Sequence, residues 1–183
     1  MPEGRYRAVR SRLALGTIFS VLAGCSGTGS PAPGFEPLFK PGGGAAARMT
    51  PKNSSVTGTI SFIRRGDKVS VSALVQELTP GRHRIFIHET GNCSSPNAAS
   101  AGKVWGAADQ PPGKRRGDLP EIVAGGEGSA SLAVSISGIT VGGGGPTDVI
   151  GRSVVVHDGL NPDPQPEFGV INDWLACGVV EPK

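Results

Sequence analysis

The segment Gly81–Glu89, with the sequence GRHRIFIHE, is the stretch that decides the fold. It follows the turn formers Thr79 and Pro80 and places apolar residues between basic ones, which is typical of a short β-strand. Elsewhere the apolar residues also fall in short runs, because the chain holds 29 Gly and 16 Pro and only 5% aromatic residues. A long helical pattern is absent from this sequence. The sequence therefore predicts an all-β domain.

Further strands are predicted where apolar residues alternate with polar ones between turn formers. The clearest is Lys68–Val75, in which the apolar residues that begin at Val69 occupy every second position. The preceding residues, Arg64–Asp67, include Gly66 and predict a hairpin turn. Ala45–Pro51 is a candidate for an additional first strand. The predicted strands are Val56–Ile63, Lys68–Val75, Arg82–His88, Ala130–Ser137, Ser153–Asp158 and Ala176–Val180.

Residues 1–24 have the pattern of a signal peptide. A stretch with four Arg precedes the apolar run Leu13–Leu22, which is short for a transmembrane helix. The series Leu22-Ala23-Gly24-Cys25 then resembles the lipobox of bacterial lipoproteins. We expect a lipid on Cys25, a Gly/Pro/Ser-rich tether over residues 25–44 and a folded domain over residues 45–183. The alternative is an ordinary secretory signal with a chance cysteine.

The charge of the chain gives no support to nucleic-acid binding. Four of the 18 basic residues and one of the 15 acidic residues precede Cys25, so the expected mature chain has 14 of each. A neutral chain with few aromatic residues does not have the basic surface that nucleic acids require. The expected partner is instead a membrane, reached through the lipid anchor on the extracytoplasmic or periplasmic side of the cell envelope. A protein or ligand partner is not identified by the sequence.

Two cysteines remain when Cys25 is set aside. Cys93 and Cys177 form an even pair in an exported protein, so the simplest expectation is one disulfide that closes a long loop. Metal ligation by two lone cysteines is the alternative.

The strand segment GRHRIFIHE resembles the G-x-H-G-F-H-x-H-E strand of the copper/zinc superoxide dismutase family. Other segments resemble family segments in the family's order, and the match runs from about Ala45 to Val180. The resemblance implies an eight-stranded Greek-key β-barrel or sandwich with a disulfide between Cys93 and Cys177. The segments that carry it are Gly91–Cys93, Ser100–Gly102, Arg116–Ile122, Ile150–His157 and Leu175–Val180.

The resemblance also assigns the copper positions residue by residue. Family members hold copper with four His, and the matching positions here are Phe86, His88, Val104 and His157. His88 and His157 are thus the residual copper positions, while Val104 removes the His that bridges copper and zinc. Phe86 and His88 lie two apart on a strand and are expected on one face.

The zinc site is reduced further. Arg115 stands where the family has a zinc His, and Asp118 is the residual zinc position. One carboxylate beside basic residues does not supply the three or four ligands that zinc requires, so we expect Asp118 to pair with Arg115 or Arg116. Trp174 stands where the family places the Arg that attracts superoxide. The third histidine, His83, matches a position that binds no metal and is expected to be structural.

Three functions follow from these replacements. The first is a non-catalytic, membrane-anchored module on a dismutase scaffold, with no catalytic residue and no cofactor. The alternative is a copper-binding protein or weak superoxide dismutase that uses His88 and His157, since two imidazoles suit Cu(I). The third is an interaction protein that acts through the loops Lys103–Arg116 and Asp158–Asp173.

Overall fold

The computed structural model describes residues 43–159 and 174–183, and these ranges form eight strands and one short 3₁₀-helix, η1 (Ala99–Ala101). Among the residues so described, no helix has the length and apolar character needed to cross a membrane. The strands are β1 (Gly44–Pro51), β2 (Thr57–Arg65), β3 (Lys68–Gln76), β4 (Gly81–His88), β5 (Ile122–Ala124), β6 (Ala130–Ile136), β7 (Ser153–Asp158) and β8 (Trp174–Pro182).

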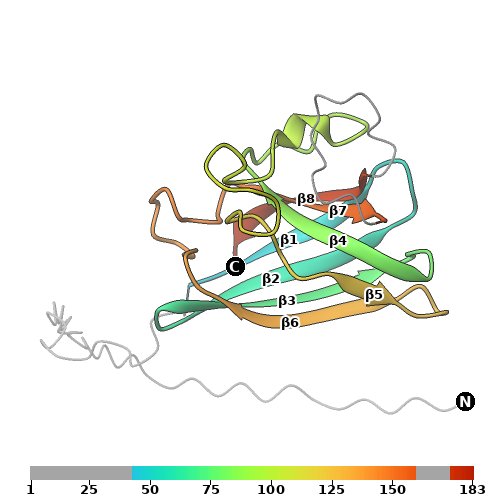
Figure 1. Cartoon of the computed structure of the whole chain (residues 1–183), viewed down its shortest axis with the longest axis horizontal. Coiled ribbons are helices and arrows are strands. Elements are labelled where there is room, and N and C mark those ends of the chain that lie inside the picture. Colours follow the sequence, from blue (N-terminus) through green and yellow to red (C-terminus); the bar gives the residue numbers. More distant parts are fainter. Residues whose placement is uncertain (1–42, 160–173) are drawn as a thin grey trace, which may run out of the picture. The chain divides into compact units, whose positions relative to one another are not determined.

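Neighbouring strands are antiparallel and follow the order β5-β4-β7-β8-β1-β2-β3-β6. The order does not follow the sequence, because β6 returns to pair with β3 and β7 lies between β4 and β8. Such returns are typical of Greek-key folds. The first and last strands of the order, β5 and β6, lie beside each other, so the sheet curls into a nearly closed barrel (Figure 1). The predicted eight-stranded Greek-key barrel is confirmed.

The hairpin between β2 and β3 is the part of the barrel that the sequence predicts most directly. Its turn consists of Gly66 and Asp67, and Gly66 adopts a φ of 63°. Arg65 pairs with Lys68 across this turn, and the register then continues along both strands. Every second residue of β3 is buried in the barrel core, as the alternation predicts.

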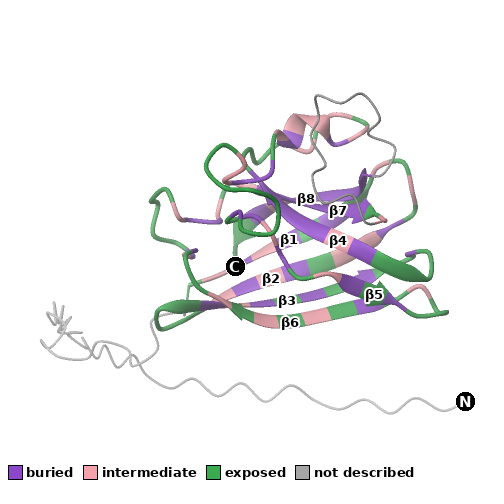
Figure 2. Ribbon diagram, in the orientation of Figure 1, coloured by how far each residue is buried: buried purple, intermediate pink, exposed green. Residues whose placement is uncertain are grey.

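Three strands, β4, β7 and β8, are buried on both faces. On β4, Ile85 and Ile87 point into the barrel core, whereas Phe86 and His88 lie on the opposite face. Residues 89–121 form a covering segment, the cover, over that outer face. Because β7 is buried on both faces, its sequence is a nearly continuous apolar run. Figure 2 shows these strands largely buried, while every second residue of β3 is buried and β6 alternates between exposed and intermediate positions after its buried first residue. The covered outer face of the barrel is where the predicted site residues lie.

The structure differs from the predicted elements in a few places. Strand β5 was not predicted, because three residues are too few to show an alternation. Ala45–Pro51 does form a strand, and it begins at Gly44, the last residue assigned to the tether. The final strand extends two residues beyond the predicted segment at each end, and β2 continues to Arg65.

The predicted disulfide joins the covering segment to β8. Cys93 and Cys177 are bonded, and their Cα atoms are 5.7 Å apart. Cys177 is fully buried in a small apolar cluster on the outer face, together with Ala98, Val155 and Trp174. The bridge therefore holds the loop that follows β4 over the outer face of the barrel.

Candidate functional site

His88 lies at the end of β4, on the covered outer face, and is fully buried. Its Nδ1 is 2.8 Å from the carbonyl oxygen of Gly102, which can only accept a hydrogen bond. Nδ1 of His88 therefore carries the proton, and the lone pair of the neutral ring is at Nε2. The covering segment thus fixes both the orientation and the tautomer of this imidazole.

His157 reaches the same place from β7. An irregularity in the β7–β8 pairing occurs between Val156 and His157, next to Trp174. The Nε2 atoms of His88 and His157 are 3.4 Å apart, and the two rings are nearly parallel at an interplanar angle of 10°. Because Nε2 of His88 is the acceptor, Nε2 of His157 donates in this long hydrogen bond. Nδ1 of His157 is then a buried acceptor, and it has no hydrogen-bond partner within the described part of the chain.

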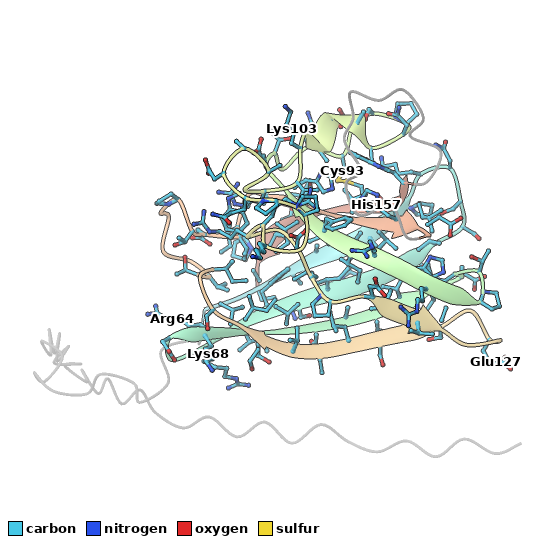
Figure 3. All side chains as sticks on the ribbon, in the orientation of Figure 1. Arg64, Lys68, Cys93, Lys103, Glu127 and His157 are labelled. Carbon is cyan, nitrogen blue, oxygen red and sulfur yellow. A yellow bond between two sulfur atoms is a disulfide. The ribbon has the colours of Figure 1, made fainter. Side chains whose placement is uncertain are left out.

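Aromatic rings enclose the histidine pair. The Phe86 ring contacts His157 edge to face at a centroid distance of 5.1 Å. The Trp174 ring lies 4.9 Å from the His88 ring and 5.0 Å from the His157 ring. All of these side chains are at most 1% exposed. Figure 3 shows His157 beside β7, on the same side of the barrel in this view as Cys93 and Lys103 of the covering segment. The pair is therefore closed off from solvent.

Burial governs the protonation of both histidines. Desolvation lowers the pKa of His88 to about 4, with a smaller lowering by the Arg115 charge, although the hydrogen bond to Gly102 acts in the opposite direction. Desolvation, the neighbouring His88 and Arg115 together hold the pKa of His157 well below its usual range. Both rings are neutral at pH 7. A neutral imidazole has the lone pair that metal ions require, and here each ring directs Nε2 at the other.

Two segments of the cover run against the end of β4. Val104 forms an isolated bridge with His88, and Asp118 forms one with Phe86. The structure thus brings the residual zinc position next to the copper positions, as the resemblance implies. Asp118 does not face them as a free carboxylate, however. Its Oδ1 accepts hydrogen bonds from Nη2 of Arg115 at 2.8 Å and from Nε of Arg115 at 3.0 Å.

Arg115 is the buried partner of this ion pair, with a side chain only 1% exposed. Its backbone N–H also donates to Oδ2 of Asp118 at 2.7 Å, so the carboxylate closes the turn from residue 115 to residue 118. The guanidinium carbon lies 5.3 Å from the centroid of the Phe86 ring. The predicted pairing of Asp118 with Arg115 is observed, whereas Arg116 instead lies over Trp105.

The third histidine lies away from this group. Nε2 of His83 donates a 2.8 Å hydrogen bond to the carbonyl oxygen of Thr79, and Nδ1 lies 3.5 Å from a carboxylate oxygen of Asp158. His83 is 1% exposed and pairs with Ile122 of β5 across the sheet. It is a buried structural residue, as expected.

The chain resembles known proteins over most of its length. The sequence pattern of the family described as copper/zinc superoxide dismutase (SODC) matches residues 56–180. The chain belongs to the copper/zinc superoxide dismutase family. An extracellular superoxide dismutase [Cu-Zn] from Brugia pahangi is 30% identical over 151 residues, which cover 74% of each chain.

Two further relatives are similar over most of their own length. Superoxide dismutase [Cu-Zn] 2 from Brassica juncea is 31% identical over 152 residues, which span 75% of this chain and 97% of that protein. A superoxide dismutase [Cu-Zn] from Onchocerca volvulus is 32% identical over 146 residues, which span 70% of this chain and 90% of that protein. The likeness to these three dismutases thus extends over 70% or more of this chain.

The residues present here do not fit the copper and zinc ions for which the dismutase family is named. No group of three or more His, Cys, Asp and Glu side chains that could hold a metal occurs in residues 43–159 and 174–183. The two imidazoles are bonded to each other, and Phe86 and Trp174 fill the space around them. Both oxygens of Asp118 are engaged by Arg115. Neither set of positions thus offers the open donor set that copper or zinc requires.

Sequence reasoning overlooked a second set of contacts in the dismutase-like barrel. Arg152 stacks on the ring of Trp105, with its guanidinium carbon 3.7 Å from the centroid, and Arg116 lies 5.1 Å from the same ring. Arg152 also donates hydrogen bonds to the carbonyl oxygens of Glu89 and Asp148. These residues hold the covering loops together. The available signal was Trp105 itself, one of only two Trp in the chain, but its proximity to Arg116 and Arg152 depends on the fold.

Proposed function

We propose that this protein is a non-catalytic member of the copper/zinc superoxide dismutase family that is lipid-anchored through Cys25 outside the cytoplasmic membrane. The observation that carries the first part is the enclosed histidine pair. His88 and His157 use their Nε2 atoms for each other, and the side chains around them are aromatic or cationic. Two such imidazoles leave two of the four positions of a tetrahedral zinc ion without a ligand, and they are only half of the four-histidine copper set of the family.

The lack of a path for the superoxide anion supports the same proposal. Dismutation requires a metal that cycles between two oxidation states and a path by which superoxide reaches it. His88 and His157 are buried, and Trp174 takes the place from which the family's Arg attracts the anion. An indole supplies no positive charge. Arg115, whose guanidinium lies over Phe86 beside the histidine pair, is itself buried and paired with Asp118.

The lipid anchor is supported by the sequence alone, because residues 1–42 lie outside the described part of the chain. The basic stretch, the apolar run and the series that ends at Cys25 follow one another in the order of a lipoprotein signal. The disulfide between Cys93 and Cys177 agrees with an oxidising compartment. Such a protein presents the barrel and its loops to the cell envelope. Of the two loops predicted to contact a protein or ligand, Lys103–Arg116 lies within the described residues, whereas residues 160–173 of the other loop, Asp158–Asp173, lie outside them.

A second function is favoured by one observation. The Nε2 atoms of His88 and His157 face each other, which is the arrangement that a two-coordinate Cu(I) ion uses. In a linear site the two nitrogens would be about 4 Å apart, at roughly 2 Å from the ion on each side. The observed separation of 3.4 Å would therefore have to widen within a tightly packed cluster. Copper binding remains the alternative function for this reason.

The deciding experiment measures metal and activity together. The mature protein is isolated from the cell envelope, loaded with copper and zinc, freed of excess metal, and analysed for bound metal and for dismutation of superoxide. We expect well below one metal ion per chain and activity no higher than that of the buffer control. One copper per chain that is lost in His88→Ala and in His157→Ala would establish the alternative function. Rapid dismutation by the loaded protein would overturn the proposal altogether.

A further inference from the structure

A buried positive charge stands where the two halves of the dismutase metal site meet. The side chain of Arg115 is 1% exposed, pairs with Asp118 at 2.8 Å and lies over the ring of Phe86. Phe86 occupies a copper position and Asp118 a zinc position, so the guanidinium contacts a remnant of each site. An arginine side chain in an ordinary solvated ion pair extends to the surface. The neighbouring side chain of Lys114 is exposed in this way, whereas that of Arg115 is not.

We propose that the guanidinium of Arg115 is a built-in replacement for the metal: it fastens the covering segment over the histidine pair and excludes metal cations from His88 and His157. The inference rests on the proposed absence of catalytic metal and deepens it, because it assigns that absence to one residue of this chain.

The fastening role follows from the hydrogen bonds. Arg115 closes a turn within the covering segment by pairing with Asp118, three residues further along the chain, and it contacts the barrel through the ring of Phe86 on β4. Nε and Nη2 of Arg115 both donate to Asp118, and so does its backbone N–H. Gly117, inside this turn, accepts a 2.8 Å hydrogen bond from the N–H of Ile87 on β4. Closing the turn therefore holds the cover against the strand that carries His88.

The exclusion role follows from charge. The guanidinium of Arg115 lies over the ring of Phe86, and the Phe86 ring contacts His157, so the positive charge lies one side chain away from the histidine pair. All of these side chains are buried, so solvent screens the charge little, and the charge opposes a metal cation at the nitrogen lone pairs of His88 and His157. The guanidinium group cannot remove this repulsion by losing its proton, because the pKa of arginine lies far above neutrality. The exclusion is thus permanent at all physiological pH values.

The test compares Arg115→Met with Lys114→Met in the mature protein. Both substitutions remove one positive charge from the same turn, but only the first removes the buried ion pair. We expect Arg115→Met to lower Tm by about 10 °C, as loss of one partner of a buried pair does, and Lys114→Met to shift Tm by about 2 °C at most. We also expect Arg115→Met to bind Cu(I) or Zn²⁺ at least about tenfold more tightly than wild type in competition with a chromophoric chelator.

Equal Tm values and equal metal affinities for the two variants would overturn the inference while leaving the proposed function intact. Stoichiometric metal in the wild-type protein would instead overturn the proposed function. If Arg115→Met does not fold, Arg115→Lys carries the test. It keeps the charge and loses the fork of donors, so it should melt below wild type and still exclude both metals. Wild-type stability or new metal binding in Arg115→Lys would contradict the inference.

Discussion

His88 and His157 differ from ordinary surface histidines because the fold keeps both rings neutral and dry. Their hydrogen bond joins two groups that would each be solvated in the unfolded chain. A proton added to either ring would lie beside the other ring, in a buried cluster that is close to the positive charge of Arg115. The native state is therefore sensitive to acid through these two side chains.

We expect the free energy of unfolding to fall as the pH is lowered from 7 to 4.5. The unfolded chain takes up protons near pH 6.5, whereas folded His88 does so only near pH 4, so the unfolded state binds more protons in between. The stability is fully present above pH 6.5 and is lost as the pH falls toward about 4. His88 contributes roughly 3 kcal/mol to this loss. Urea denaturation at a series of pH values measures the slope.

His88→Gln supplies the comparison for this pH series. Its slope between pH 6.5 and 4.5 should be clearly shallower than that of wild type, because only His157 of the pair still titrates. If the free energy of unfolding fell equally with pH in wild type and in His88→Gln, groups other than His88 would cause the acid sensitivity.

At the scale of elements, the segment 103–118 lies close against β4. The N–H of Trp105 donates to the carbonyl oxygen of Ile87 at 2.9 Å, and the N–H of Ile87 donates to Gly117 at 2.8 Å. A Cβ atom at Gly117 would lie 2.2 Å from the Ile87 oxygen. The approach of the cover to the strand thus requires a residue without a side chain at this position.

Gly117→Ala is expected to destabilise the protein by about 2–3 kcal/mol, because the cover must move away from β4. Gly125→Ala is the matched control, since a Cβ there meets nothing within 4 Å, and it should change stability by about 0.5 kcal/mol or less. Denaturant unfolding of both variants gives the two values. A Gly117→Ala protein as stable as the control would mean that the cover is not held by this contact.

The second link between elements is the disulfide. Cys93 and Cys177 are 84 residues apart, so the bond removes much freedom from the unfolded chain. The double variant Cys93→Ser/Cys177→Ser should lose about 4–5 kcal/mol in the chain-entropy account. Unfolding of the oxidised protein and of the double variant under the same conditions measures the difference. Free thiols at both positions in protein taken directly from the envelope would contradict the assignment of a permanent bond.

At the scale of the whole molecule, the proposed lipid on Cys25 would decide where the barrel acts. In the lipoprotein interpretation the mature chain begins at Cys25, and mass spectrometry of its first peptide should find a lipid on that residue. Cys25→Ser should move the protein from the membrane fraction to the soluble fraction, whereas Ser26→Ala should leave it at the membrane. An unmodified Cys25, or cleavage at another residue, would refute the interpretation.

The sequence by itself determined the strand pattern, because alternation in β3 and the turn at Gly66 are local properties of neighbouring residues. It also determined which side chains stand at the positions that match the family's metal ligands, since these follow from the order of family segments. The three residues of β5 were missed because so short a strand has no visible period and depends on pairing with distant β4.

Only the tertiary structure decided how the site residues are arranged. His88 and His157 are separated by 69 residues, so their direct hydrogen bond depends on the register of β4 against β7. The placing of Trp174 against both rings depends likewise on β8. The sequence offered Arg115 or Arg116 as the partner of Asp118, whereas the pairing with Arg115 and the burial of Arg115 over Phe86 result from the packing of the cover on the barrel. The sequence gives the identity of each side chain directly. The contacts, burial and charge environment of that side chain depend on segments that only folding brings together.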